Sequence, residues 1–449
     1  MDITPSTTTE ISAPETSSWQ EIKAVLSLRN FRLLWLGQGI SLLGDQFGFI
    51  ALPWLVLQLT GDAFAMGLVL AMMGVPRAIF MLFGGALTDR FSPRLLMLAT
   101  NVARMILVSA LAFAILTNVI AMWMIYLFAL LFGLADAFFY PASSAIVPTI
   151  LPKQQLQIGN SITQGTAQLS VFLGPVLAGG IIAIFAGEST GGDTPPDLRG
   201  IGIAFAFDAI TFLASALTLK LMSEGKKQIE DAEEKQNVLE SIREGLAYVW
   251  QDDTLRTIFL VVAAISVLTI APINLGVPVI ADNRLSGAAA YGILMSAYGA
   301  GSLIGIVFSG IFPRPPEHRQ GSILFGAVAM VGLFTVGLAF SQTIWVASLF
   351  LLLSGIFDGW VMIQFTTWLQ LRTPEALLGR IMGLLMFAFV GLAPVADALF
   401  GWLIEWNVTA VLIFSGLTMT LISIFAALQP DIKNMGTAVS SESGVQNGS

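Results

Sequence analysis

Long apolar segments separated by short polar turns follow one another along most of the chain. A helix needs about 20 apolar residues to cross a bilayer core of about 30 Å. Twelve such runs can be counted, covering residues 32–59, 63–87, 95–117, 120–147, 161–186, 201–222, 256–280, 288–311, 321–340, 343–367, 381–404 and 407–428. The pattern predicts an all-α integral membrane protein with twelve transmembrane helices. Because the number is even, both termini should lie on the same side of the membrane.

The basic residues indicate which side that is. Short cytoplasmic loops of membrane proteins carry an excess of Lys and Arg. If the N-terminus is inside, all but four of the 21 basic residues fall in cytoplasmic segments. The exceptions are Arg199 and Arg284 in outer loops, and Arg77 and Arg104 within spans. We therefore expect a multi-pass protein of the plasma (inner) membrane with both termini cytoplasmic.

The two halves of the chain repeat each other. The longest polar interruption, residues 223–253, separates six spans from six. When the second half is shifted by 222 to 225 residues it comes into register with the first, so that Gly133 matches Gly355 and Asp136 matches Asp358. Parallel six-helix repeats with a site between them are typical of transporters that work by alternating access. The sequence thus predicts two pseudo-symmetric six-helix bundles.

This duplication predicts five regions. They are a disordered cytoplasmic tail at 1–27, an N-terminal bundle at 28–222, a cytoplasmic linker at 223–253, a C-terminal bundle at 254–430 and a second tail at 431–449. In the linker, apolar residues from Val238 to Trp250 recur on one helical face. We expect an amphipathic helix there that lies on the inner membrane surface.

Composition excludes several other classes of protein. Hydrophobic residues make up 55% of the chain and charged residues 11%, whereas soluble proteins carry about 25% charged residues. The net charge of −8 argues against nucleic-acid binding, and the absence of Cys together with a single His, His318, argues against a metal site. No phosphate-binding Gly-x-x-x-x-Gly-Lys surrounds the lone Gly225-Lys226 pair. We expect no enzyme activity, no catalytic residue and no cofactor.

Charged residues within the predicted spans are the main candidates for function. Each costs roughly 2.5–3.5 kcal/mol at the bilayer centre, so each needs a partner or a task. They are Asp45, Arg77, Arg104, Asp136, Asp208, Asp358 and Asp397. Asp45, Arg77 and Arg104 fall at similar depths, which predicts a buried ion-pair cluster in the first half. The alternative is that these charges only hold helices together.

A loop between the second and third spans carries a recognisable motif. In "GGALTDRFSPR" (84–94), Gly85, Asp89, Arg90 and Arg94 match the loop signature Gly-x-x-x-Asp-Arg-x-Gly-Arg-Arg of the major facilitator superfamily, although Ser92 and Pro93 depart from it. The chain therefore resembles that superfamily over about residues 28–428. "FRLLWLGQGISLLGDQFGFIALPWLVLQLTG" is similar to the first helix of its drug-proton antiporter branch, which includes macrolide efflux proteins and the enterobactin exporter.

A second motif lies on the fifth span. "GPVLAGG" (174–180), with Gly174, Pro175 and Gly179, resembles the Gly-Pro-rich motif associated with exporters. The resemblance also implies that Asp89 faces the N-terminus of the eleventh helix and latches the two halves on the cytoplasmic side.

The resemblance further implies that helices 1, 4, 7 and 10 line the cavity. On that ground we expect Asp45 to couple protons to transport, with Arg77, Asp136, Asp358 and Asp397 as further cavity candidates. For Asp136, an ion pair with Arg94 is the alternative to a place in the cavity. For Arg104 and Asp208 we expect helix packing alone, because the resemblance puts helices 3 and 6 away from the cavity.

Together these observations predict a secondary transporter. We expect a monomer in the lipid bilayer that exports amphipathic small molecules, drug-like, macrolide-like or siderophore-like, in exchange for protons. Import, or flipping of a lysophospholipid by the same fold, is the alternative, and a receptor that does not transport is a more remote one.

Overall fold

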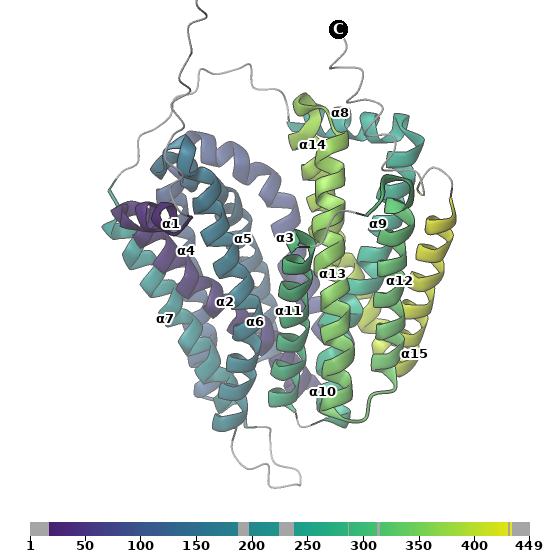
Figure 1. Cartoon of the computed structure of the whole chain (residues 1–449). Helices are drawn as coiled ribbons and strands as arrows, with labels where there is room; N and C mark the ends of the chain where they lie inside the picture. The colour runs from purple at the N-terminus through teal and green to yellow at the C-terminus, as the bar shows by residue number, and fades with distance from the viewer. Residues whose placement is uncertain are drawn as a thin grey trace, which may run out of the picture.

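The structure is a bundle of long helices. The computed structural model describes residues 18–186, 197–223, 238–285, 287–311 and 315–429, together with Ile432, and contains no strand in those residues. Figure 1 shows the first half (purple to teal) on one side and the second half (green to yellow) on the other. Mostly apolar helices satisfy their own backbone hydrogen bonds, which is what a chain in lipid requires.

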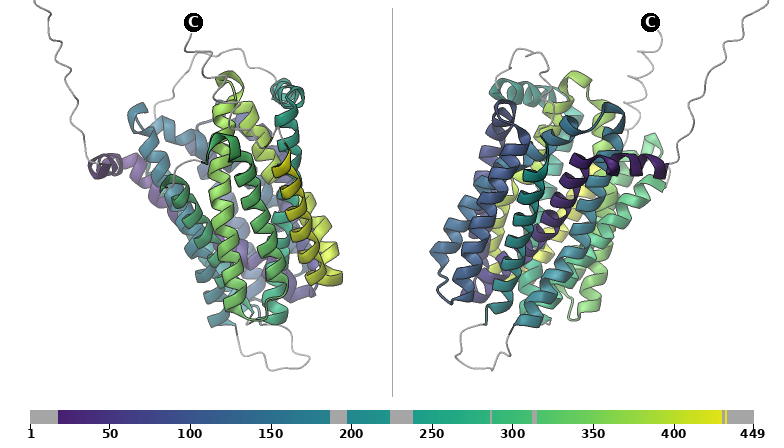
Figure 2. Two further views of the ribbon diagram at one scale, coloured as in Figure 1. Left: turned by 45° about the vertical axis from the view of Figure 1, so that its right-hand side comes forward. Right: turned by 90° about the vertical axis from the view of Figure 1, so that its left-hand side faces the viewer.

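Among the described residues seven α-helices precede the linker, and all but the first of them follow the predicted spans closely. The seven are α1 (Ser18–Ser27), α2 (Arg29–Thr60), α3 (Ala63–Arg90), α4 (Pro93–Leu116), α5 (Met122–Ile150), α6 (Leu156–Phe185) and α7 (Arg199–Leu221). The first, α1, lies in the 1–27 tail, so the expectation of disorder is wrong for Ser18–Ser27. Helix α1 is short and runs across the bundle axis in the right-hand view of Figure 2, whereas α2 to α7 are long enough to cross a membrane.

The second half begins with a helix in the linker, α8 (Val238–Gln251). Next come α9 (Asp253–Ala271), a π-helical turn (Pro272–Gly276) and α10 (Val277–Arg284), which together form one crossing. The remaining helices are α11 (Ala288–Ile311), α12 (Gln320–Ala339), α13 (Ile344–Arg372), α14 (Glu375–Met386), a π-helical turn (Phe387–Gly391) and α15 (Ala393–Leu428).

The last helical stretch contains two crossings. Among the described residues eleven stretches are long and apolar enough to span a membrane, and the last of them, Arg380–Leu428, has 49 residues. At about 1.5 Å per residue this is more than twice the thickness of a bilayer core. Its helical geometry breaks at Asn407 (φ −165°, ψ 99°), whose side chain accepts a hydrogen bond from the Ala410 N–H at 3.0 Å. This is the geometry of an N-cap, so a new helix begins there, and the eleven stretches of the described residues fit the predicted twelve crossings.

The two bundles touch closely at one end, through glycines. A Cβ on Gly179 of α6 would lie 2.6 Å from the Ala288 carbonyl oxygen, and one on Gly67 of α3 would lie 2.3 Å from the Asp397 carbonyl oxygen. Backbone atoms cannot move aside as a flexible side chain can. Glycine at these positions is therefore what lets α6 approach α11, and α3 approach α15, so closely.

The buried core divides differently at the two ends of the molecule. Toward α10, one continuous apolar cluster includes residues of both bundles, such as Phe47 and Leu412. Toward α1 and α8, each bundle has a cluster of its own, one around Phe31 and the other around Trp368. The bundles are thus joined at the α10 end and packed separately at the α1/α8 end, which are the lower and upper ends of Figure 1.

Candidate functional site

A cavity of about 160 Å³ lies within the first bundle, between α2, α3, α5 and α7. Its polar wall consists of Asp45, Gln46, Arg77, Asp136, Tyr140 and Asp208. Its apolar wall includes Phe49, Phe128, Phe132 and Phe205. Ligand sites of proteins are commonly apolar pockets with a few convergent polar groups, as this one is.

Arg104 of α4 anchors the polar wall from behind. Its side chain is only 2% exposed. One guanidinium nitrogen donates to Asp136 at 3.0 Å and the other to the Asn101 side-chain oxygen at 2.5 Å. The guanidinium carbon lies 3.8 Å from the ring centre of Phe139 and 4.6 Å from that of Phe212. The carboxylate and the two aromatic faces offset the cost of removing the guanidinium from water.

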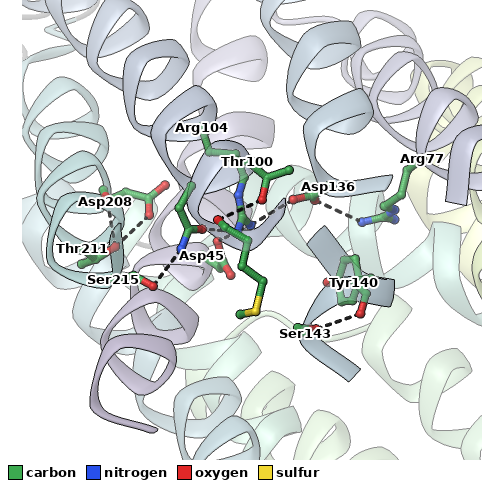
Figure 3. Close-up of polar contacts among 12 residues, drawn as sticks. Asp45, Arg77, Thr100, Arg104, Asp136, Tyr140, Ser143, Asp208, Thr211 and Ser215 are labelled. Atoms are coloured by element: carbon green, nitrogen blue, oxygen red, sulfur yellow. Dashed lines mark hydrogen bonds and ion pairs between the residues drawn. The ribbon is translucent and has the colours of Figure 1, made fainter. Parts of the chain in front are cut away.

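The other members of the cluster are held less tightly. Asp45 lies 3.9 Å from the same Arg104 nitrogen, and its side chain is 30% exposed, against 8% for Asp136. Arg77 lies 4.0 Å from Asp136, and its Nε has no hydrogen-bond partner. Figure 3 shows Asp136 between the two arginines. The predicted ion-pair cluster therefore exists, but its centre is Asp136 and Asp45 lies at its edge.

Asp208 also belongs to the cavity. It is almost fully buried on α7, accepts a hydrogen bond from the Thr211 hydroxyl at 3.3 Å, and lines the same cavity as Asp45. A Cβ on Gly44 of α2 would lie 2.6 Å from the Asp208 carboxylate, so the glycine makes room for it. The expectation that the sixth span lies away from the cavity is therefore wrong, because Asp208 lines it. Arg104 of the third span does not line the cavity but pairs with Asp136, which does. That these two side chains serve helix packing alone stays a prediction.

Among the described residues, neither carboxylate of the second bundle forms an ion pair with this cluster, although Asp397 is close enough to interact with the charge of Arg77. Asp358 of α13 accepts a hydrogen bond from the Tyr298 hydroxyl of α11 at 2.9 Å and lines a separate cavity of about 80 Å³. Asp397 is 4% exposed and accepts a long hydrogen bond, 3.4 Å, from the Asn274 side chain. Of the predicted cavity residues, the structure therefore brings together Asp45, Arg77 and Asp136, and leaves the other two elsewhere.

The loop motif is seen only in part. The side chains of Asp89 and Arg90 and the surroundings of Gly85 lie outside what the structure describes, although α3 remains helical to Arg90. Arg94 donates to the carbonyl oxygens of Leu219 at 2.7 Å and Lys220 at 2.8 Å, at the C-terminal end of α7. A cation is favourable there because the last carbonyls of a helix lack intrahelical partners. Arg94 is thus not the partner of Asp136.

The motif on α6 makes close contacts on two sides. A Cβ on Gly174 would lie 2.3 Å from the Gln46 side chain of α2. A Cβ on Gly292 of α11 would lie 2.4 Å from the Pro175 carbonyl oxygen. Gly179 contacts the same glycine. The motif therefore joins the first bundle to the second at the α10 end.

Several residues of the site have no motif to mark them. Asn101, one turn before Arg104, donates in turn to Ser215 at 2.9 Å and so positions the guanidinium. Phe139 and Phe212 come from two other helices. In the sequence, the one sign of these residues is Asn101, a polar residue one helical turn from an intramembrane arginine.

Among the described residues, no group of three or more His, Cys, Asp or Glu side chains could hold a metal ion.

The family model described as Major Facilitator Superfamily matches residues 34–396. The chain belongs to this superfamily. "Multidrug efflux pump Tap" of Mycolicibacterium fortuitum is 24% identical over 88% of this chain and 94% of its own length. "Macrolide efflux protein A" of Streptococcus pyogenes is 22% identical over 68% of this chain and 71% of its own. "Enterobactin exporter EntS" of Escherichia coli is 26% identical over 79% and 80%.

Solved structures share the fold. A bacterial homologue of the human lysosomal transporter Spinster, in an inward-facing and occupied conformation, has a TM-score of 0.65 at 13% identity, over 92% of this chain and 96% of that one. The nucleoside transporter NupG has a TM-score of 0.66 at 12% identity, over 88% and 98%. The chain is therefore a multi-pass major facilitator transporter with efflux proteins among its relatives.

Proposed function

We propose that this transporter exports amphipathic small molecules across the plasma membrane by alternating access, driven by proton entry. The observation that carries the proposal is the charge balance of the first-bundle cavity. Three carboxyl groups, Asp45, Asp136 and Asp208, meet two guanidinium groups, Arg77 and Arg104. Fully ionised, they sum to −3 + 2 = −1, so one bound proton makes the cluster neutral. Uncompensated buried charge is costly, which favours binding of one proton.

Asp45 is the carboxyl group best placed to carry that proton. Asp136 is held by Arg104 at 3.0 Å and is almost buried, whereas Asp45 makes only the 3.9 Å contact and is 30% exposed toward the cavity. A proton carrier must exchange with water, and the more exposed carboxylate does so more readily. Arg104 then has a positioning role: it holds Asp136 in place and supplies positive charge beside Asp45.

The packing of the two bundles supports alternating access. They share an apolar core at the α10 end and have separate cores at the α1/α8 end. If the basic loops are cytoplasmic, as the distribution of Lys and Arg predicts, this is a conformation closed to the outside. Opening outward would separate the glycine contacts between α6 and α11, such as Gly179 with Gly292.

The cavity wall supports the proposed substrate class. Aromatic side chains, including Phe49, Phe128 and Phe132, line it together with the carboxyl and guanidinium groups. A ligand with an apolar body and a polar group suits such a wall. The printed names of the relatives, a macrolide efflux protein, a multidrug efflux pump and an enterobactin exporter, support efflux as the direction.

We further propose that Asp89, at the end of α3, latches the two halves by facing the N-terminus of α14. A carboxylate at a helix N-terminus is favourable by about 0.3–1 kcal/mol when exposed. Asp89→Asn should then abolish transport at normal expression and increase the accessibility of introduced cytoplasmic cysteines. Normal transport by Asp89→Asn, with loss in Arg90→Ala, would mean that the loop acts through its positive charge instead.

Transport by purified protein in liposomes tests the main proposal. Under an imposed pH gradient, wild-type protein should accumulate an amphipathic drug against its concentration gradient. Asp45→Asn should abolish that accumulation while leaving exchange down a gradient intact. Glu405→Gln, which removes a negative charge from an exposed position on α15, is the matched control and should behave as wild type. Accumulation by Asp45→Asn equal to that of wild type would refute the assignment.

A further inference from the structure

The second cavity, of about 80 Å³, lies inside the second bundle between α9, α12 and α13. Phe389 of the π-helical turn and Met419 of α15 complete its wall. Asp358 is the one acidic or basic side chain among the residues that line it. The cavity is therefore an apolar space with a single carboxyl group.

Comparison with the repeated half shows what this carboxyl group lacks. Asp358 is the repeat of Asp136, at the same spacing that relates Gly133 to Gly355. Asp136 is neutralised by Arg104, which comes from α4, the third helix of its bundle. The third helix of the second bundle is α12, and it carries no charged residue from Gln320 to Ala339.

The side chains that α12 contributes to the cavity are apolar. Helix α12 contributes Phe325 and Val328 to the wall, in place of a basic side chain. In the part of the chain that the structure describes, no Arg or Lys forms an ion pair with Asp358, and its recorded partner is the neutral Tyr298 hydroxyl. An ionised carboxylate accepts about four hydrogen bonds, so this one retains capacity for a cation.

The wall also suits the apolar part of a cation. Phe325 and Phe365 are buried side chains of the cavity, and Met419 adds a polarisable thioether. In the first bundle the protein holds its own cation, the Arg104 guanidinium, with a carboxylate and two Phe rings. Carboxylates and aromatic faces are likewise the groups that bind quaternary ammonium ions.

We propose that this cavity is a subsite for an organic cation, whose charged ammonium or phosphonium centre faces Asp358 while its apolar substituents lie against Phe325, Phe365 and Met419. The inference rests on the proposed function and deepens it, since it names the substrate class: lipophilic monovalent cations, and not anions. A water molecule needs about 10–15 Å³ of cavity volume. A cavity of about 80 Å³ therefore has room for about five or more groups of that size. That is enough for a trimethylammonium head, whose remaining substituent extends beyond the cavity.

Binding by the purified full chain tests the subsite separately from transport. The probe is radiolabelled benzyltrimethylammonium, measured by equilibrium dialysis, with its neutral carbon isostere neopentylbenzene as competitor. Wild-type protein should bind the cation, and the neutral isostere should fail to displace it. Asp358→Asn should weaken binding by about 30-fold or more, because one partner of a buried charge pair has been removed. Glu405→Gln is the control and should bind as wild type does.

Two further variants keep the test decisive if Asp358→Asn folds poorly. Tyr298→Phe removes the neutral donor and leaves the charge, so it should bind the cation at least as well as wild type. Val328→Arg places a guanidinium in the wall, as α4 does in the first bundle, and should abolish binding. Equal affinity in wild type and Asp358→Asn, or in wild type and a folded Val328→Arg, overturns the subsite.

The outcomes distinguish the subsite from the function on which it rests. If wild-type protein accumulates amphipathic drugs under a pH gradient but Asp358→Asn binds the cation unchanged, the proposed function stands and the subsite fails. If the cation binds through Asp358 but nothing accumulates under a pH gradient, the subsite stands and proton-driven export fails.

Discussion

Replacing Arg104 with leucine should destabilise the protein far more than the same replacement of Arg77. Arg104 is 2% exposed and donates to Asp136 at 3.0 Å and to Asn101 at 2.5 Å. Arg77 is 23% exposed and makes one contact with Asp136, at 4.0 Å. Both lie within the first bundle, so the pair forms a matched comparison of a tightly held and a loosely held arginine.

The expected magnitudes follow from burial. Removing one partner of a buried ion pair costs about 3–5 kcal/mol, because the other charge is left without compensation. Arg77 remains near Asp136 in the Arg104→Leu variant and compensates part of its charge, so we expect the lower end, about 3 kcal/mol. Arg77→Leu removes only a long, partly exposed contact and should cost about 1 kcal/mol or less.

The assay is equilibrium unfolding of the purified protein in mixed micelles with increasing denaturing detergent. A second substitution then tests the cause of the loss. If the cost arises from the stranded carboxylate, Asp136→Asn in the Arg104→Leu background should restore about 1–2 kcal/mol, within the usual range of coupling energies between neighbours. Equal losses for Arg104→Leu and Arg77→Leu, or no recovery in the double variant, would refute this account of the cluster.

Three further outcomes are expected. Partial burial raises the pKa of Asp252, but the hydrogen bonds from Arg372 and from backbone N–H groups outweigh this and lower the pKa below 3.8. The contribution of the Asp252–Arg372 pair to stability is thus present above pH 3.8 and lost as the pH falls through the lowered pKa. Asp252→Asn should therefore be less stable than wild type at pH 6, and the two should be equally stable at a pH well below the lowered pKa. Gly179→Val should disfavour the conformation closed at the α10 end, seen as greater labelling of cysteines introduced there, because its Cβ meets backbone atoms at 2.6 Å; unchanged labelling would contradict this. Impermeant reagents added to intact cells should label a cysteine at Thr190 and spare one at Ser441, and the reverse result would invert the predicted topology.

The sequence by itself determined the class of protein, its helical spans and its superfamily. The requirement for about 20 apolar residues per crossing is local, so it can be read from one segment at a time. The helices α2 to α7 accordingly coincide with the first six predicted spans to within a few residues. The orientation in the membrane, which rests on the loop charges, remains a prediction.

Only the tertiary structure decided which charges meet. Arg104 and Asp136 are both apparent as intramembrane charges, but their pairing depends on how α4 and α5 are rotated about their axes. Depth along the helices predicted a cluster of Asp45, Arg77 and Arg104 but not that Asp136 is at its centre, because depth carries no information about rotation. Asp208 was placed away from the cavity on the resemblance alone, and the packing of α7 brings it to the cavity. Asp358 is a similar case. The sequence shows that α12 carries no charged residue, but only the packing of the helices shows that α12 and Asp358 line one apolar cavity. The lengths of the helical spans are set by the thickness of the bilayer, whereas the site is set by contacts between helices distant in sequence. Glycines such as Gly44 and Gly67 permit these contacts because they let the helices approach closely.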